Sequence, residues 1–194
     1  MRYLLFALSL ATACASSSPL DRVQAYRAAV SSGADVSHFL APDARMWYGK
    51  KEGAGEPLSN GTGSYAHWDH YFGSKATLTD WQVTNGAVTA IVHETNGFYR
   101  LLDWQPDPYR MTWWLDDQGR IREALLTSIP GVGGKGRLAE FRAWAREHHP
   151  TELDYLMPNG HIDPKADRAE RFAALLREWR LAAGLPAVEF TPGL

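Results

Sequence analysis

The chain has 194 residues, of which 45% are hydrophobic and 12% aromatic, with 20 Lys and Arg against 22 Asp and Glu. This length and balance fit one globular domain, and eight Trp, eight Tyr and seven Phe exclude a low-complexity, disordered chain. A net charge of −2 gives no reason to expect nucleic-acid binding. One cysteine excludes an intramolecular disulfide framework and a multi-cysteine metal site.

The first 18 residues have the features of an export signal. A basic dipeptide is followed by an apolar run over residues 3–10 (YLLFALSL), which is too short to span a membrane, and by small residues. The only cysteine, Cys14, follows at the position where bacterial lipoprotein signals are cleaved and lipidated. We expect residues 1–18 to be a signal and tether, and the protein to be a periplasmic or outer-membrane lipoprotein. The alternative is ordinary cleavage that leaves a soluble, exported protein.

Three helices are predicted before the sheet. Apolar residues at helical spacing indicate a first helix over residues 20–32. Asp35 is placed to cap a short second helix, which Pro42 ends. After a polar, glycine-rich loop over residues 49–63, a third helix is predicted over residues 64–72 (SYAHWDHYF).

The middle of the chain has the two-residue period of β-strands. The predicted strands are residues 45–48, 78–84, 87–94, 109–115 and 120–128. Asn85-Gly86 predicts a hairpin between the second and third of these, and residues 98–104 favour a helical turn. Helices followed by such strands indicate an α+β fold with a curved antiparallel sheet.

A helical extension is predicted after this sheet. Residues 131–136 (GVGGKG) form a glycine-rich linker, and Leu138, Phe141 and Ala145 mark a fourth helix. Asp163-Pro164 is a favourable start for the last helix, which carries an apolar stripe. We therefore expect a domain over residues 19–130 and an extension over residues 131–194 that packs on its sheet, because neither helix buries its apolar face alone.

Several of these segments resemble the nuclear transport factor 2-like (NTF2-like) superfamily, which includes polyketide-cyclase-like (SnoaL-like) and ketosteroid-isomerase-like proteins. They are the first helix with the break at Gly33-Ala34-Asp35, residues 41–47 (APDARMW), the Asn85-Gly86 turn and residues 117–123 (DQGRIRE). The resemblance covers residues 20–129. It implies a cone-shaped fold that encloses a pocket, used by some members for catalysis and by others for binding, and it makes a homodimer a further expectation. The fold alone does not decide the function.

Glu94 and Glu123 are the candidate catalytic residues. Alternation places Glu94 on the same strand face as three apolar residues, and Glu123 on the same face as Ile121 and Leu125. A carboxylate among apolar neighbours has a raised pKa and can act as an acid or a base. The alternative is that Glu94 ends its strand in solvent and that Glu123 pairs with Arg110 or Arg122.

The candidate ligand-binding residues are four aromatic side chains and one arginine. They are Tyr48, Trp68, Tyr99, Arg110 and Trp114. Such residues suit a pocket for a flat or apolar ligand, whereas ordinary core packing is the alternative for the aromatic ones. Arg100 is expected near the mouth of the pocket, where it can bind an anionic group, or else on the open surface.

No metal or cofactor site is expected. His67 and His70 have a spacing that can share a metal ion on a helix, but no third ligand is fixed by the sequence. Residues 131–136 lack the Gly-Lys-Ser/Thr ending of a phosphate loop, and a Gly-x-Ser-x-Gly motif is absent.

Three functions stay open at this point. The first is a cell-envelope protein that binds a small apolar or aromatic ligand in its pocket. The second is an isomerase- or hydrolase-type enzyme that uses the pocket carboxylates. The third is a non-enzymatic interaction protein whose C-terminal helices bind a partner, which would require an exposed apolar face on the last helix.

Overall fold

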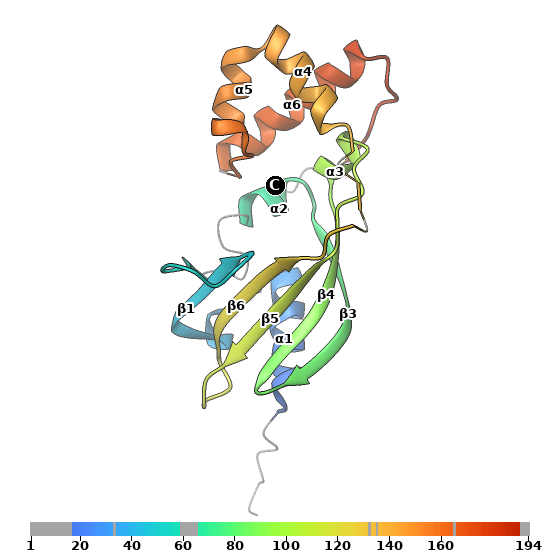
Figure 1. Ribbon diagram of the computed structural model, residues 1–194. Helices are drawn as coiled ribbons and strands as arrows, with labels where there is room; N and C mark the ends of the chain where they lie inside the picture. Colours follow the sequence, from blue (N-terminus) through green and yellow to red (C-terminus); the bar gives the residue numbers. More distant parts are fainter. Residues whose placement is uncertain are drawn as a thin grey trace, which may run out of the picture.

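The computed structural model describes residues 17–32, 34–58, 66–131, 133–134, 136–164 and 166–190. The predicted signal segment, including Cys14, lies outside the described residues. Helix α1 lies against a curved sheet, and a group of helices stands at one end of that sheet (Figure 1). This arrangement confirms the predicted α+β class.

The described part of the chain forms a six-stranded sheet in the order β2-β1-β6-β5-β4-β3. The strands are β1 (Leu40–Tyr48), β2 (Glu56–Pro57), β3 (Lys75–Thr84), β4 (Ala87–Thr95), β5 (Tyr109–Leu115) and β6 (Ile121–Ser128). All neighbours run antiparallel except β1 and β6, which pair in parallel. The predicted antiparallel sheet is therefore confirmed except at β1, which pairs with β6 in parallel. Alternation reports which side chains share a face, but not the direction in which two distant strands pair.

The two hairpins turn where the sequence predicts. Asn85 and Gly86 have φ angles of 51° and 76°. Positive φ at both central residues is typical of the type I′ turn, which matches the twist of the flanking strands. In the β5–β6 turn, the Asp116 carboxylate accepts hydrogen bonds of 2.9 Å from the backbone N–H groups of Gln118 and Arg120. These turns fix the register of β3 with β4 and of β5 with β6.

A bulge in β3 directs Trp81 into the core. The register with β4 shifts between Thr79 and Gln82, and Asp80 within this stretch has a φ of 52°. An extra residue of this kind bends the strand and changes the face to which the following side chains point. Trp81 consequently stacks on the fully buried Trp113, with ring centroids 5.9 Å apart.

Helix α1 (Pro19–Ser32) confirms the first predicted helix. Ser18 and Asp21 cap its start reciprocally, because the Asp21 N–H donates to Ser18 Oγ at 3.2 Å and the Ser18 N–H donates to Asp21 Oδ2 at 3.1 Å. Val23 and Tyr26 are buried against residues of β4, β5 and β6. This contact forms the core on the concave side of the sheet.

Pro42 does not end a helix, contrary to the prediction. The second helix is only a 3₁₀ turn, η1 (Ser37–Phe39), and Leu40 already belongs to β1. The pairing of β1 with β6 is irregular between Leu40 and Arg45. Pro42 lies in this stretch, where a residue without a backbone N–H is tolerated in a strand.

The helices at the end of the sheet come from two parts of the chain. They are α2 (Ala66–Tyr71), α3 (Gly97–Leu101), α4 (Leu138–His148), α5 (Pro150–Leu156), the 3₁₀ turn η3 (Pro158–Gly160) and α6 (Ala166–Ala182). The sequence predicted α2, α4 and α6 and a helical turn near α3, but it did not predict α5. Pro150 begins α5, where its missing N–H costs no bond within the helix.

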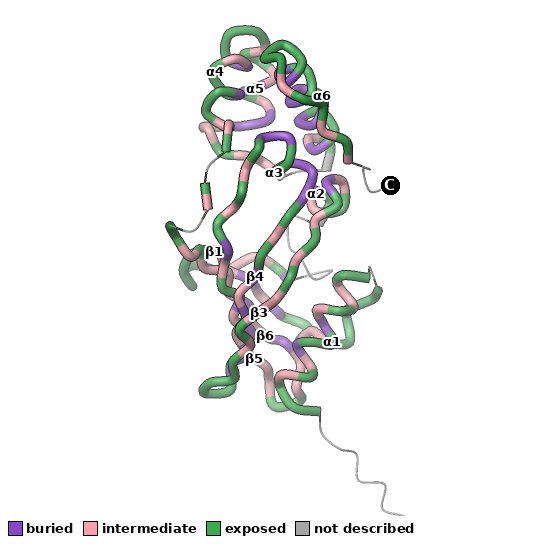
Figure 2. Tube along the Cα trace, turned by 90° about the vertical axis from the view of Figure 1, so that its right-hand side faces the viewer, coloured by how far each residue is buried: buried purple, intermediate pink, exposed green. Residues whose placement is uncertain are grey.

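These helices form a second core, separate from the core between α1 and the sheet (Figure 2). Phe172 of α6 lies at its centre, with its ring centroid 5.6 Å from Trp68, 5.5 Å from Phe98 and 5.7 Å from Phe141. The extension therefore packs on helices α2 and α3. We had expected it to pack on a face of the sheet. Phe172 and Trp179 are 0% and 2% exposed, so the apolar stripe of α6 is not a free surface.

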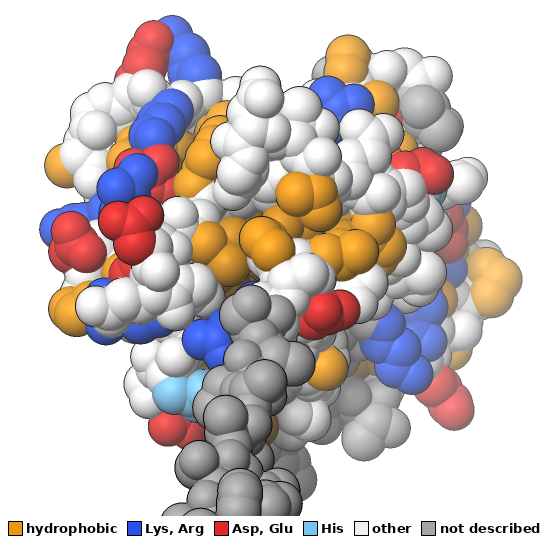
Figure 3. All heavy atoms as spheres, turned by 90° about the horizontal axis from the view of Figure 1, so that it is seen from below, with side chains coloured by type: hydrophobic (Ala, Val, Ile, Leu, Met, Phe, Trp, Pro, Cys, Tyr) orange, Lys and Arg blue, Asp and Glu red, His pale blue; other side chains and the backbone are white. Residues whose placement is uncertain are grey.

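The surface at the hairpin end of the sheet has side chains of several kinds. Hydrophobic side chains lie at the centre of this view, and positive and negative charges are mixed around them (Figure 3).

Within the described ranges, none of the helices combines the length and apolarity that crossing a membrane requires.

We predict that Phe172→Ala lowers the free energy of unfolding by about 3–5 kcal/mol, because it removes a buried ring and leaves a cavity. Urea denaturation followed by circular dichroism measures the change. Leu181→Ala is the matched control, since Leu181 lies in the same helix but is 81% exposed. Equal, small effects of both substitutions would contradict the second core.

Candidate functional site

A cavity of about 820 Å³ opens between the concave side of the sheet, helix α1 and helices α2 and α3. Its largely apolar or aromatic lining residues are Val30, Met46, Tyr48, Trp68, Ala76, Tyr99, Trp104, Pro106, Tyr109, Met111 and Leu126. Its polar lining residues include Arg27, Ser31, Asp69, His70, Ser74, Lys75, Glu94, Asn96, Asp107 and Ser128. A volume of this size holds a small organic molecule.

A chain of hydrogen bonds joins two carboxyl groups at the polar end of this cavity. Ser74 Oγ donates to Asp69 Oδ1 at 3.1 Å, and it accepts from Asn96 Nδ2 at 3.2 Å. The same amide nitrogen donates to Glu94 Oε1 at 3.0 Å. Asp69 comes from α2 and Glu94 from the end of β4, so Ser74 and Asn96 hold together carboxyl groups from two distant segments.

Tyr109 and Arg27 complete this polar cluster. The Tyr109 hydroxyl donates to Glu94 Oε2 at 3.4 Å, from the first residue of β5. Arg27 of α1 lines the same cavity, and its buried Nε has no hydrogen-bond partner among the described residues. Arg27 therefore brings a positive charge to the cluster. Its Nε–H is a donor without a hydrogen-bond acceptor among the described residues.

Burial changes the acidity of this cluster. Burial raises the pKa of Asp69 to about 7, and the nearby charge of Glu94 adds to this, against the opposing effects of Ser74 and Arg27. Burial also raises the pKa of Glu94, although the hydrogen bonds from Asn96 and Tyr109 limit the shift. The pKa of Tyr109 is raised by burial and by the charge of Glu94, so its hydroxyl stays protonated and able to donate. Asp69 is thus an acid that exchanges a proton near neutral pH.

Four of the seven residues predicted for catalysis or ligand binding line this cavity. Glu94 is among them because the alternation of β4 directs it to the same face as the buried Val88, Ala90 and Val92. Tyr48, Trp68 and Tyr99 also line the cavity. Trp68 belongs at the same time to the second core, where it is 4% exposed.

The structure places the other three, Glu123, Arg110 and Trp114, away from the cavity. On β5 and β6, the neighbours Trp113 and Ala124 are fully buried on the concave side, so these three face the opposite side of the sheet. There Glu123 pairs with Lys51, and Arg122 Nε lies 3.7 Å from Glu123 Oε1. Lys51 Nζ is also 5.1 Å from the ring centroid of Trp114. The sheet therefore separates Glu123 from Glu94.

The sequence analysis missed Asp69, Ser74, Asn96, Tyr109 and Arg27. Asp69 lies between His67 and His70, which were considered only as a pair of metal ligands, and Asn96 follows the predicted strand over residues 87–94. A usable signal existed for Asp69, because it directly follows Trp68 on the apolar side of the predicted helix. Asn96 caps α3, where its Oδ1 accepts from the Tyr99 N–H at 2.9 Å. Its second role, as donor to Glu94, depends on the folded chain.

The described residues contain no group of three or more His, Cys, Asp or Glu side chains that is arranged to hold a metal ion. His67 is exposed, and His70 lies at the edge of the cavity. The polar cluster instead consists of two carboxyl groups, a hydroxyl, an amide, a phenol and a guanidinium. Such a set can bind the polar group of an organic ligand and exchange protons with it.

No family model matches the chain, and no curated protein matches it. Among solved structures, it is similar to an NTF2-like protein from Burkholderia thailandensis, with 16% identity and a TM-score of 0.43 over 59% of this chain and 92% of that one. It is also similar to a protein of the SnoaL-like family from Agrobacterium tumefaciens, with 14% identity and a TM-score of 0.42 over 57% and 96%.

A third similar structure is IdmH from Streptomyces antibioticus, named as a candidate polyketide cyclase, with 22% identity and a TM-score of 0.41 over 58% of this chain and 92% of that one. Proteins named as NTF2-like and SnoaL-like are therefore among the solved structures similar to this chain. At these identities and TM-scores, no residue role passes from them to this chain.

We predict that Glu94→Gln lowers the pKa of Asp69 from about 7, because it removes the neighbouring negative charge. The pKa should stay above 3.8, because Asp69 remains buried. Carbon-13 NMR of the side-chain carboxyl groups over a pH series measures both values. Glu123→Gln, on the other face of the sheet, should leave the pKa of Asp69 unchanged. An unchanged value in Glu94→Gln would contradict the coupling.

Proposed function

We propose that the protein binds a small, mainly apolar molecule with at least one polar group in the 820 Å³ cavity. The observation that carries this proposal is the division of the cavity wall. Eleven aromatic or aliphatic residues and ten polar residues line it, and Ser74 and Asn96 join the carboxyl groups of Asp69 and Glu94. Apolar walls contribute affinity and a few convergent polar groups fix the orientation of a ligand.

The polar end favours a neutral ligand group, such as a carbonyl or a hydroxyl. A ligand carboxylate would lie beside the carboxyl groups of Asp69 and Glu94, although Arg27 and Lys75 also bring positive charge to the cavity wall. Asp69, with a pKa of about 7, can donate to a carbonyl when protonated and accept from a hydroxyl when ionised. This flexibility suits a ligand that carries either group.

We predict that filling the cavity prevents binding of the neutral fluorescent probe N-phenyl-1-naphthylamine. Ala76 lines the cavity, so Ala76→Phe should weaken binding at least about tenfold. Fluorescence titration gives the dissociation constants. Thr77→Phe is the matched control, because Thr77 is the next residue of β3 and its side chain is exposed. Equal affinities of both folded variants would contradict binding in this cavity.

A second candidate function is catalysis of proton transfer in the same cavity. The buried pair of Asp69 and Glu94 supports it, because a carboxyl group with a pKa near 7 is an effective base or acid at neutral pH. In this proposal ionised Asp69 removes a proton from carbon next to a ligand carbonyl. Glu94, with the Tyr109 hydroxyl bonded to it, holds Asp69 in a site of raised pKa.

We predict that the protein accelerates hydrogen–deuterium exchange at the carbon atoms beside the carbonyl of 2-tetralone in D₂O, measured by proton NMR. The rate should rise through pH 7, because Asp69 acts only after it loses its proton. Asp69→Asn should reduce the rate by about 100-fold. In Glu94→Gln the midpoint should move to lower pH, whereas Glu123→Gln should behave as the unchanged protein does.

Exchange that is no faster than in Ala76→Phe would contradict catalysis of this kind. Binding of N-phenyl-1-naphthylamine would be unaffected by that result, so the two candidate functions are separable.

We also propose that the protein acts in the cell envelope through an anchor at Cys14. The support for this is the sequence of residues 1–18 alone.

A further inference from the structure

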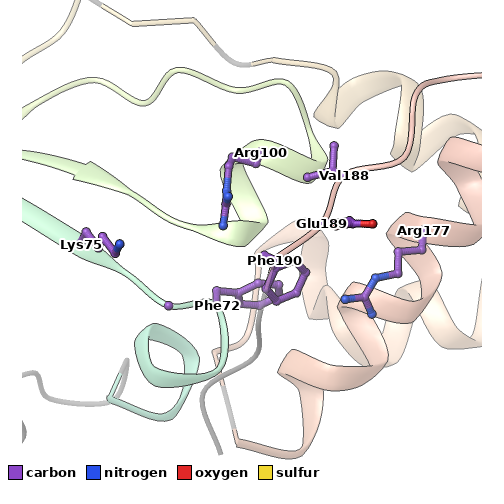
Figure 4. Close-up of a pocket in the computed structure, with 8 residues that line it drawn as sticks. Phe72, Lys75, Arg100, Arg177, Val188, Glu189 and Phe190 are labelled. Carbon is purple, nitrogen blue, oxygen red and sulfur yellow. The ribbon is translucent and has the colours of Figure 1, made fainter.

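A second cleft, of about 610 Å³, shares Lys75 with the ligand cavity. It is lined by Phe72, Gly73, Lys75, Arg100, Arg177, Val188, Glu189 and Phe190 (Figure 4). Lys75 lines both spaces, so the cleft and the cavity are neighbours. The other lining residues belong to the cleft alone. They come from the turn between α2 and β3, from α3, from α6 and from the segment after α6.

The segment after α6, residues 185–190, is held in place by a buried arginine. Arg180 donates from Nε and Nη2 to the Pro186 carbonyl at 3.0 and 2.9 Å. It also donates from Nη1 to the Leu101 carbonyl at 2.7 Å, and it is 4% exposed. This one side chain therefore ties the segment to the end of α3, and the wall of the cleft is part of the packed structure.

Phe190 forms the apolar part of the cleft. Its ring centroid lies 5.6 Å from that of the fully buried Phe72, and its ring covers Gly97 so closely that a Cβ atom there would lie 2.7 Å from it. The Arg177 guanidinium lies 4.8 Å from the centroid of the Phe190 ring. The apolar wall thus has a cation beside it.

The charge of the cleft is unbalanced. Three cations, Lys75, Arg100 and Arg177, line it together with one carboxylate, Glu189, which gives +3 − 1 = +2 in a chain whose net charge is −2. Among the described residues, none of the three cations has an ion pair or a hydrogen bond from its side chain. Figure 4 shows Lys75 and Arg100 on one side of Phe190 and Arg177 on the other. Like charges that surround one space repel each other, and an anion relieves this repulsion.

We propose that this cleft is a second binding site, for an organic anion that has a carboxylate or phosphate group and an apolar chain. Arg100 and Arg177 offer planar guanidinium groups, which bind such oxygen pairs with two hydrogen bonds, and Lys75 adds a point charge. The apolar chain lies against the partly exposed side chains of Val188 and Phe190. This site goes beyond the proposed function of the cavity, whose ligand is neutral.

Isothermal titration calorimetry with sodium octanoate tests the proposal on the full-length protein. Arg100→Gln and Arg177→Gln should each weaken binding about tenfold, because each removes one charged hydrogen-bond donor group. Higher salt should weaken the binding to the unchanged protein as well. Arg110→Gln is the matched control, since Arg110 is exposed on the far face of the sheet and should leave the affinity unchanged. Octyl phosphate, in a parallel titration, shows which anionic group binds more tightly.

Three results would overturn the proposal. The first is that the titration detects no binding of octanoate or of octyl phosphate, or that Arg100→Gln, Arg177→Gln and the control Arg110→Gln all bind octanoate with equal affinity. The second is equal affinity for neutral octanamide, which would show that the charges contribute nothing. The third is loss of octanoate binding in Ala76→Phe but not in Arg100→Gln, which would place the ligand in the first cavity. Because N-phenyl-1-naphthylamine reports on that cavity separately, failure of one proposal is distinguishable from failure of the other.

Discussion

The amide of Asn96 is the constraint on which the rest of the site depends. Asn96 is 3% exposed, and its side chain bonds to Glu94 at the end of β4, to Ser74 before β3 and to the first turn of α3. A buried amide that loses these partners costs free energy, so the three segments must meet at this residue. Their meeting places Glu94 and Tyr99 on the wall of one cavity, and it brings the Ser74 hydroxyl to Asp69.

The helices that supply part of this wall need the C-terminal extension. Helices α2 and α3 have six and five residues, and helices of this length are not stable in water by themselves. Their buried side chains Trp68 and Phe98 pack on Phe172 from the extension. The extension is therefore part of the architecture that positions Asp69 and Tyr99. Arg180 strengthens the same junction, because it joins α6 to the carbonyl group of Leu101 at the end of α3.

Local patterns in the sequence predicted what depends on near neighbours in the chain. The type I′ turn at Asn85-Gly86 and the inward face of Glu94 both follow from residues a few positions away. The parallel pairing of β1 with β6 and the contact of Tyr109 with Glu94 depend on segments far apart, which no local period encodes. Pro42 shows the same limit. Its residue type indicates the end of a helix, but the irregular pairing of β1 accommodates it within a strand.

The contrast between Glu94 and Glu123 shows why the site is on only one side of the sheet. Both are glutamates in strands rich in apolar residues, and the sequence alone gave them equal standing. On the convex side Glu123 pairs with the amine of Lys51, a partially exposed cation, so its charge is balanced. On the concave side helices exclude water from Glu94, and neutral donors from Asn96 and Tyr109 take the place of an ion pair. Burial without a bonded cation raises the pKa of Glu94 above its ordinary value. The chemistry therefore follows from what covers each face of the sheet rather than from the residue type.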